Sequence, residues 1–371
     1  GVTGVQTCAL PISNATAAGH ANAHYVRRRE ELAAWLDARA QPGDLVFYTI
    51  LVSNPDAARA KRDVRLRDVP DAALRLRPGS LRVDGAPPGD ALVPGAAGLG
   101  FDLKLVGTNG YDETADSDVV VITAGVPRKK DPVTGKFTSR DELVEINRKI
   151  VGGVTREIAS RSPNAVLICV SNPLDAMCHV MYEESKFPKE RVVGMAGVLD
   201  TARYKTFIAM ELGVSVEDIH GMVLGGHGDT MVPVTNYTTV SGIPVDDLVK
   251  MGKSSKEAID AIVARTRSGG GEIVGLLKTG SAFYAPAASG IAMAEAYLND
   301  QKRILPCAAY VDGQYGVDGL YVGVPVMIGA NGVEQVIEIE LDDEAKGNLQ
   351  VSVDAVKELL EACKGIDPSL A

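Results

Sequence analysis

From Asp102 onward, short runs of β-branched residues alternate with longer amphipathic segments. Three of these runs are expected to be strands: Asp118–Thr123, Ala165–Val170 and Arg191–Met195. Between the first two, apolar residues recur at intervals of three and four, as on one helix face: Leu143, Ile146, Ile150, Val154 and Ile158. Pro163 is expected to end this helix. Strands that alternate with helices in this way build a parallel sheet, so the pattern predicts an α/β fold.

The last third of the chain has a different pattern. Strand periodicity occurs at Val324–Ile328 and Val336–Leu341, and helical periodicity occurs around Val353–Cys363. These segments predict an α+β unit with an antiparallel sheet and a closing helix. A chain of 371 residues is long enough for about two domains.

Composition excludes several classes of protein. The 48 acidic and 38 basic residues give a formal net charge of −10, which disfavours a nucleic-acid partner because such binding depends on clustered cations. No apolar run is long enough to cross a membrane. The five cysteines are few and unclustered, which is typical of free thiols in a reducing compartment such as the cytoplasm. The same scatter argues against a metal site.

The first hundred residues differ from the rest. They contain eleven arginines and one lysine, whereas lysines are common afterwards. Val2–Ile12 resembles a translated sequencing adapter and is excluded from the fold prediction. Tyr25–Ala40 has helical composition, and Pro42 follows it. Residues 1–41 are therefore expected to be a poorly ordered tail with an extra helix.

Residues 42–99 are expected to be a β-rich fragment and a linker. Their alternating runs predict half-buried antiparallel strands at Leu45–Ser53, Asp63–Val69 and Leu74–Val83. Residues 42–84 resemble a β-sandwich repeat of bacterial surface proteins, in which a P-G-D turn opens a T-I-x-V-x-N strand. Only three or four strands are present, so the sequence predicts a fragment rather than a complete sandwich.

Two segments beyond the predicted strands carry residues suited to proton transfer. His227 stands among glycines in Gly225–Thr230, so a ligand can approach an imidazole that titrates near neutral pH. Asp200 is a candidate to hold His227 in one tautomer and to stabilise its cationic form. Arg203 lies one helical turn beyond Asp200, and it therefore faces the same side and offers a planar fork for a substrate carboxylate.

Six ordered motifs identify a family. They are I-T-A-G-V-P-R-K (Ile122–Lys129), S-R-D-E-L-V-E-I-N (Ser139–Asn147), V-S-N-P-L-D (Val170–Asp175), G-V-L-D-T-A-R (Gly197–Arg203), G-G-H-G-D-T-M-V-P (Gly225–Pro233) and G-S-A-F-Y-A-P-A-A-S (Gly280–Ser289). Through these motifs, residues 100–368 resemble the lactate/malate dehydrogenase superfamily, and within it the malate dehydrogenases. The resemblance implies a Rossmann-type parallel sheet at 100–197 and an α+β substrate domain at 198–371.

The resemblance also implies a reaction and its residues. Hydride would pass reversibly between a small-molecule substrate, malate or oxaloacetate, and NAD. His227 would accept the proton of the substrate hydroxyl with Asp200 as its partner, and Arg203 would bind the carboxylate beside the reacting carbon. Arg140 would polarise the carbonyl from a mobile loop. Asn172 would contact both substrate and nicotinamide, and the remaining residues of the cofactor groove would be Gly125, Asn147, Val170 and Ser171. Related enzymes are dimers or tetramers, which implies a homo-oligomer.

Substrate choice is expected to depend on Arg128. Malate and oxaloacetate carry a second carboxylate that would be buried without a partner unless another cation were present. The resemblance places arginine at this position in malate dehydrogenases and glutamine in lactate dehydrogenases. Eleven residues separate Arg128 from Arg140, more than is usual in the family, so Lys129 or Lys130 is an alternative partner for the second carboxylate.

One expected motif is absent. A site of this kind opens with a strand, G-x-G-x-x-G and a helix, whose N-terminus binds the pyrophosphate, and no such motif occurs in the sequence. The family resemblance begins abruptly at Phe101–Asn109. We therefore expect an incomplete Rossmann-type sheet with an open edge, and no feature of the Arg-rich segment suggests a replacement strand.

Three hypotheses follow from this sequence. The first is a malate dehydrogenase whose 5′ end was replaced when sequence reads were assembled, which leaves this polypeptide impaired in cofactor binding. The second is a genuine fusion of a β-rich module with a degenerate, non-enzymatic dehydrogenase. The third is a lactate or other 2-hydroxy-acid dehydrogenase. The choice between NAD and NADP stays open, because the residue that reads the ribose lies in the missing unit.

Overall fold

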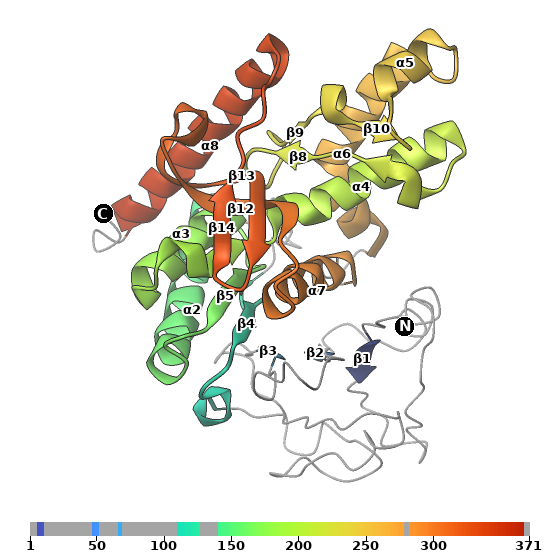
Figure 1. The fold of residues 1–371 in the computed structure, drawn as a ribbon. Coiled ribbons are helices and arrows are strands. Elements are labelled where there is room, and N and C mark those ends of the chain that lie inside the picture. Colours follow the sequence, from blue (N-terminus) through green and yellow to red (C-terminus); the bar gives the residue numbers. More distant parts are fainter. Residues whose placement is uncertain are drawn as a thin grey trace.

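The computed structural model describes residues 6–10, 47–51, 66–68, 110–126, 140–277, 282 and 284–366. Its largest sheet has seven strands in the order β14-β13-β12-β6-β5-β4-β3 (Figure 1). The strands are β3 (Leu66–Asp68), β4 (Val119–Ile122), β5 (Val166–Cys169), β6 (Val192–Gly194), β12 (Arg303–Asp312), β13 (Asp318–Gly329) and β14 (Gly332–Val336). The strands expected at 118–123, 165–170 and 191–195 are thus confirmed as β4, β5 and β6.

The sheet has a parallel half and an antiparallel half. Strands β3, β4, β5 and β6 run parallel, with Val119 opposite Val166 between β4 and β5. Strand β12 joins β6 antiparallel through Ala308 and Gly194, and β13 and β14 continue antiparallel. The predicted α/β architecture, with an antiparallel sheet in the last third, is confirmed.

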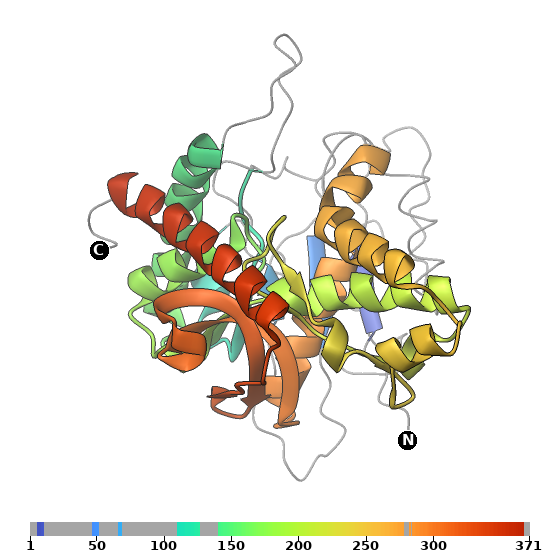
Figure 2. The same ribbon diagram turned by 90° about the horizontal axis from the view of Figure 1, so that it is seen from above.

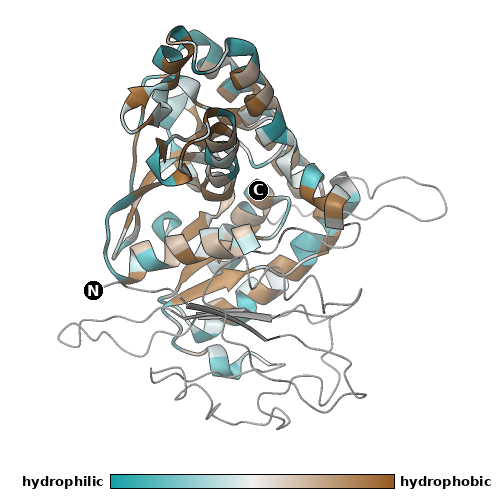
Figure 3. Ribbon diagram, turned by 90° about the vertical axis from the view of Figure 1, so that its right-hand side faces the viewer, coloured by the Kyte–Doolittle hydropathy of each residue, from teal (hydrophilic) through white to brown (hydrophobic). Residues whose placement is uncertain are grey.

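Helices cover both faces of the sheet, as the view from above shows (Figure 2). They are α2 (Arg140–Arg161), α3 (Leu174–Ser185), α4 (Ala196–Leu212), α5 (Val245–Lys250), α6 (Lys256–Leu277), α7 (Tyr284–Leu298) and α8 (Asp343–Ile366). Successive residues of β4 alternate between the two faces: Val120 packs in one core cluster with α2 and α3, and Val121 packs in another with α7. Hydropathy colouring shows hydrophobic strands in the main sheet (Figure 3). Buried faces on both sides explain why these strands are continuous apolar runs.

Helix α2 was predicted, but its buried face differs in detail from the expected stripe. Ile158 and Val154 are buried as expected, whereas Ile146 is 40% exposed. Asn147 is buried in its place and is only 1% exposed. The stripe was wrong at this position because a polar side chain with enough hydrogen bonds can occupy a buried position.

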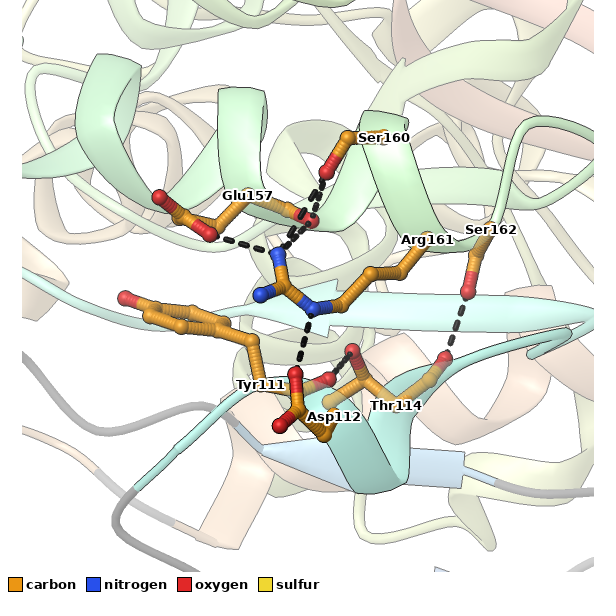
Figure 4. Close-up of polar contacts among 7 residues, drawn as sticks. All are labelled: Tyr111, Asp112, Thr114, Glu157, Ser160, Arg161 and Ser162. Atoms are coloured by element: carbon orange, nitrogen blue, oxygen red, sulfur yellow. Dashed lines mark hydrogen bonds and ion pairs between the residues drawn. The ribbon is translucent and has the colours of Figure 1, made fainter.

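The end of α2 is tied to the segment that leads into β4 (Figure 4). Arg161 Nε donates to Asp112 Oδ1 at 3.1 Å, and Ser162 Oγ donates to the Thr114 carbonyl at 2.5 Å. The Ser117 amide donates to Ser162 Oγ at 3.1 Å. These contacts hold the segment before β4 against the C-terminal end of α2.

Smaller elements complete the second half of the chain. The short strands are β7 (Ile219–His220), β8 (Val223–Leu224), β9 (Val232–Pro233), β10 (Thr239–Val240) and β11 (Ile243–Pro244). Strands β8 and β9 form one hairpin, and β11, β10 and β7 form another small sheet. The 3-10 helices are Asp112–Thr114, Lys189–Arg191, Val216–Asp218, Thr235–Tyr237 and Gln314–Gly316.

Two predictions in the last third have different outcomes. The helix around 353–363 is confirmed within α8, and 324–328 lies in β13. The strand predicted at Val336–Leu341 is wrong, because β14 ends at Val336 and the residues after it are not in a strand. Ile337 still donates its amide to the Pro325 carbonyl at 2.8 Å, so the chain leaves the sheet just beyond β14.

Three short strands are described before residue 100. Strand β2 (Phe47–Leu51) pairs antiparallel with β1 (Gln6–Leu10). Strand β2 lies within the run predicted at Leu45–Ser53. Strand β1 lies within Val2–Ile12, the adapter-like segment that was excluded from the fold prediction. Strand β3 falls within the predicted run Asp63–Val69, but it pairs parallel with β4, with Leu66 opposite Val119.

The pairing of β3 corrects two expectations. Strand β3 does not pair antiparallel with its neighbour, and the edge of β4 is not open, because β3 lies along it. Sequence alternation indicates a strand but contains no information about its partner, because the pairing uses backbone groups that all residues share. The helix predicted at Tyr25–Ala40 and the strand predicted at Leu74–Val83 lie outside the described residues.

Candidate active site

One residue separates β6 from helix α4, which carries two site residues one turn apart. Asp200 and Arg203 both point to the same side, and Arg203 Nη1 lies 3.3 Å from Asp200 Oδ1. Both side chains are largely buried, with exposures of 2% for Asp200 and 11% for Arg203. The spacing predicted that the two side chains face the same side, and the structure adds that they form an ion pair. The α4 segment reaches this position because the carboxyl ends of parallel strands meet at one edge of the sheet.

The loop between β8 and β9 carries His227. The amide of Val223 in β8 donates to Thr201 Oγ1 on α4 at 2.9 Å, which holds the hairpin beside the helix. Gly225 has φ +84°, which favours glycine, and it exchanges two backbone hydrogen bonds with Gly323 of β13 at 2.8 and 3.0 Å. A Cβ at Gly225 would lie 2.5 Å from Ser352 Oγ. Gly225 and Gly226 are therefore needed for close packing, since a Cβ at Gly226 would lie 2.6 Å from Val356 Cγ2.

His227 and Asp200 form a direct pair. His227 Nδ1 lies 2.7 Å from Asp200 Oδ2, as the sequence predicted. Because Asp200 occupies Nδ1, Nε2 is the ring nitrogen left for a substrate. Burial lowers the pKa of His227, but the charges of Asp200 and Asp175 and the bond to Asp200 outweigh burial, so the pKa is raised. This arrangement favours the protonated form of the imidazole.

Arg203 keeps unused hydrogen-bonding capacity. Burial lowers the pKa of its guanidinium, opposed by the charge of Asp200. Its Nε is buried and has no hydrogen-bond partner among the described residues. A Cβ added at Gly269 of α6 would lie 3.2 Å from Arg203 Cδ, so the glycine makes room for the arginine stem. An unsatisfied buried guanidinium N–H next to a reactive histidine is suited to an anionic ligand.

Asn147 connects the loops that follow β4 and β5. Its Oδ1 accepts from the Val126 amide at 2.6 Å, and its Nδ2 donates to the carbonyls of Val126 and Asn172 at 3.1 and 2.6 Å. Gly125 has φ +150°, and a Cβ there would lie 3.1 Å from Asn147 Oδ1. Asn172 precedes Pro173 through a cis peptide bond. The sequence-predicted residues Gly125, Asn147 and Asn172 are thus brought together.

Ser171 and Val170 join the same two loops. Ser171 is 4% exposed, and its Oγ donates to the carbonyls of Ala124 and Ile122 at 2.6 and 3.2 Å. The Val170 amide donates to the Ile122 carbonyl at 2.9 Å. These residues join the loops after β4 and β5 through neutral hydrogen bonds.

Two predicted substrate residues are not placed. Arg128 lies outside the described residues, and Arg140 begins α2 but its side chain is also outside the described part. In the described ranges, no group of three or more histidine, cysteine or acidic side chains could hold a metal ion. No helix among the described residues is long and apolar enough to cross a membrane.

Sequence reasoning missed Asp175. This carboxyl group lies in the first turn of α3, is 5% exposed, and accepts the His227 amide at 2.9 Å. The motif S-N-P-L-D contained it, but nothing in the linear sequence indicated that it would face the loop of His227. The contact depends on how α3 packs against the β8–β9 hairpin.

The nicotinamide end of a dinucleotide site fits these residues. The loops after β4 and β5 lie at the carboxyl edge of parallel strands, where such cofactors bind, and Gly125 leaves the backbone bare. The phosphate end has no corresponding sequence motif. The residues after β3 are Val69-Pro70-Asp71-Ala72, which include no glycine.

Comparisons with known proteins agree with this geometry. The family model of the lactate/malate dehydrogenase NAD binding domain matches residues 96–194, and that of the α/β C-terminal domain matches 197–365. A malate dehydrogenase of Methylobacterium radiotolerans is 56% identical over 291 residues, which cover 78% of this chain and 89% of that protein.

Solved structures show the same relationship. A malate dehydrogenase from Salinibacter ruber matches with TM-score 0.67 and 50% identity, covering 74% of this chain and 84% of that chain. A lactate dehydrogenase from Cryptosporidium parvum, complexed with lactic acid and nicotinamide adenine dinucleotide, matches with TM-score 0.69 and 42% identity, covering 73% and 83%. The predicted family, Rossmann-type fold, oxidoreductase class and NAD cofactor are confirmed. The chain belongs to the lactate/malate dehydrogenase family.

Proposed function

We propose that this chain catalyses the reversible, NAD-dependent conversion of malate to oxaloacetate, a step of the tricarboxylic acid cycle. The observation that carries the proposal is the buried triad of Asp200, His227 and Arg203, which combines a proton acceptor with a carboxylate-binding fork. Curated relatives at 56% identity are named malate dehydrogenases, which supports the choice of substrate.

The site residues have separate roles in this proposal. His227 Nε2 takes the proton of the malate hydroxyl, and Asp200 stabilises the resulting imidazolium through Nδ1. Arg203 binds the carboxylate beside the reacting carbon and orients it. When bound, NAD accepts the hydride, and this chain's residues position the substrate and move the proton.

The loops after β4 and β5 form the nicotinamide end of the site. Gly125, Asn147, Val170, Ser171 and Asn172 line it, and Asn172 also contacts substrate. Arg140 polarises the carbonyl oxygen in which negative charge develops, and Arg128 binds the second carboxylate. Since the sequence contains no G-x-G-x-x-G, we expect NAD affinity to depend on the nicotinamide end and to be reduced.

Domain organisation and assembly complete the proposal. The dinucleotide-binding domain is truncated and covers 100–197, and the substrate domain covers 198–371. The family match begins at residue 96, which supports a chimeric origin for the preceding part. The exposed apolar residues Met210, Met251 and Leu276 support a homo-oligomer, and four buried free cysteines support a cytoplasmic location.

Substrate competition tests the assignment. We expect kcat/KM with NADH to be higher for oxaloacetate than for pyruvate, because pyruvate lacks the carboxylate that Arg128 binds. Arg128→Gln should reduce or reverse this preference, since it leaves the second carboxylate without a cation. Higher efficiency with pyruvate in the unmodified chain would contradict the malate assignment and favour a lactate dehydrogenase.

A further inference from the structure

The loop that carries His227 is held by three consecutive backbone amides. Those of Gly225, Gly226 and His227 donate to the Gly323 carbonyl on β13, to Ser352 Oγ on α8, and to Asp175 Oδ2 on α3 at 2.8, 2.8 and 2.9 Å. Two of the acceptors are neutral, and the third is a carboxyl group. Neutral acceptors already hold the two preceding amides, so the carboxyl group at His227 introduces a charge that anchoring of the loop does not require.

The carboxyl group of Asp175 is buried and only partly hydrogen-bonded, which a purely structural acceptor does not require. Its side chain is buried, and its second oxygen, Oδ1, is also buried and has no hydrogen-bond partner among the described residues. An incompletely satisfied buried carboxyl group is costly in free energy. The first turn of α3 offsets part of this cost, because the N-terminus of a helix favours negative charge.

We propose that Asp175 is a positioning residue for His227: it fixes the backbone of the loop and, as a second carboxylate beside Asp200, stabilises the protonated imidazole. Asp200 contacts the ring directly, whereas Asp175 acts from the backbone side. The inference extends the proposed function, since it concerns the histidine that exchanges the substrate proton, but the contact itself does not depend on substrate identity.

The electrostatic environment of Asp175 and His227 agrees with this role. Burial raises the pKa of Asp175 to about 6, while the amide and charge of His227 lower it. Asp175 is therefore mostly ionised at pH 7 and neutral in mild acid. The other titratable groups that face the pair are Asp200 and Arg203 from α4 and Cys178 from α3. From helix α8, the uncharged side chains of Ser352 and Val356 lie next to Gly226.

The experiment is a histidine ring titration by NMR on the full chain, with ¹³C-labelled histidine and no substrate. His227→Gln assigns the His227 signal among the five histidines. Asp175→Asn keeps an oxygen acceptor for the amide but removes the charge, so the His227 midpoint should move to lower pH. Asp175→Glu, which restores the charge, should recover part of that shift. Asp218→Asn, which removes an exposed carboxylate near β7, should leave the midpoint unchanged.

An unchanged His227 midpoint in Asp175→Asn would overturn the proposal, because it would mean that Asp175 is a hydrogen-bond acceptor only. Should this variant fail to fold, carboxyl ¹³C titration of Asp175 in the unmodified chain decides the question. The Asp175 signal must then respond to protonation of His227, and a signal that does not respond overturns the proposal.

A kinetic measurement separates this inference from the proposed function. Oxaloacetate reduction needs protonated His227, so in Asp175→Asn its rate should fall at lower pH than in the unmodified chain, with KM at neutral pH little changed. Asp175→Ala, which also loses the acceptor, should reduce kcat/KM about tenfold or more. If the NMR midpoint moves but no variant turns over oxaloacetate, the role of Asp175 stands and the substrate assignment fails.

Discussion

The two ends of the proposed site are built with different chemistry. At the substrate end, ionisable groups contact one another directly: His227 pairs with Asp200, and Arg203 pairs with the same carboxylate. At the nicotinamide end, Asn147 and Ser171 bind backbone groups through neutral hydrogen bonds. Proton transfer requires groups that titrate near the working pH, whereas a cofactor cleft requires a fixed shape. We therefore expect pH dependence to arise at the substrate end and cofactor affinity to arise at the nicotinamide end.

The largest expected effect is loss of the proton acceptor. His227→Asn should reduce kcat for malate oxidation on the order of 10³-fold, because general acid–base catalysis contributes about 10² to 10⁴. NADH affinity, measured by fluorescence titration, should stay within about twofold if the two ends are separate. His220→Asn, an exposed histidine of β7, is the matched control and should keep full activity. A loss of NADH affinity in His227→Asn as large as the loss of kcat would show that the two ends of the site are not separate.

A second effect concerns the stability cost of the substrate end. Burial raises the pKa of Asp175 from 3.8 to about 6, so protonation stabilises the fold below pH 3.8 and this contribution is lost as pH rises through 6. Asp175→Asn removes the charge, and it should raise the free energy of unfolding by about 3 kcal/mol at pH 8. At pH 5 the gain should be about half as large. Urea unfolding at both pH values measures this difference, and an equal gain at both would contradict the explanation.

The smallest effect belongs to the nicotinamide end. Asn147→Ala leaves the Val126 amide and two carbonyls without their partner, so KM for NADH should rise about tenfold. The pH profile of kcat should not move, because no ionisable group is lost. Ile146→Ala changes the exposed neighbour on α2 and should alter neither quantity. A shifted profile in Asn147→Ala would show that the ends are coupled.

Sequence patterns predicted the elements better than their partners. Runs of β-branched residues located β4, β5 and β6 because strands buried on both faces are continuously apolar. The Asp200–Arg203 spacing predicted that the two side chains face the same side, because residues three apart share a helix face. The pairing of β3 with β4 could not be predicted, since Leu66 and Val119 meet through backbone groups common to all residues.

Asp175 shows a second limit of sequence reasoning. Asp200 was found because an Asp and a His in family motifs suggest a pair. The hydrogen bond that joins Asp175 to the loop comes from the backbone amide of His227, so no complementary side chain indicated it. Ile146 and Asn147 show the same limit: hydrophobic periodicity favoured burial of Ile146, but the hydrogen bonds of Asn147 made that neighbour the buried residue.

The pH dependence of the reaction in both directions tests the central claim most directly. If His227 exchanges the substrate proton, kcat/KM for oxaloacetate must fall as pH rises through the pKa of His227, because reduction needs the imidazolium. For malate it must fall as pH decreases, because oxidation needs the neutral ring. The residual activity of His227→Asn should show neither of these two pH dependences. The account would be contradicted if kcat/KM changed with pH in the same direction for both substrates, or if either pH dependence persisted in His227→Asn.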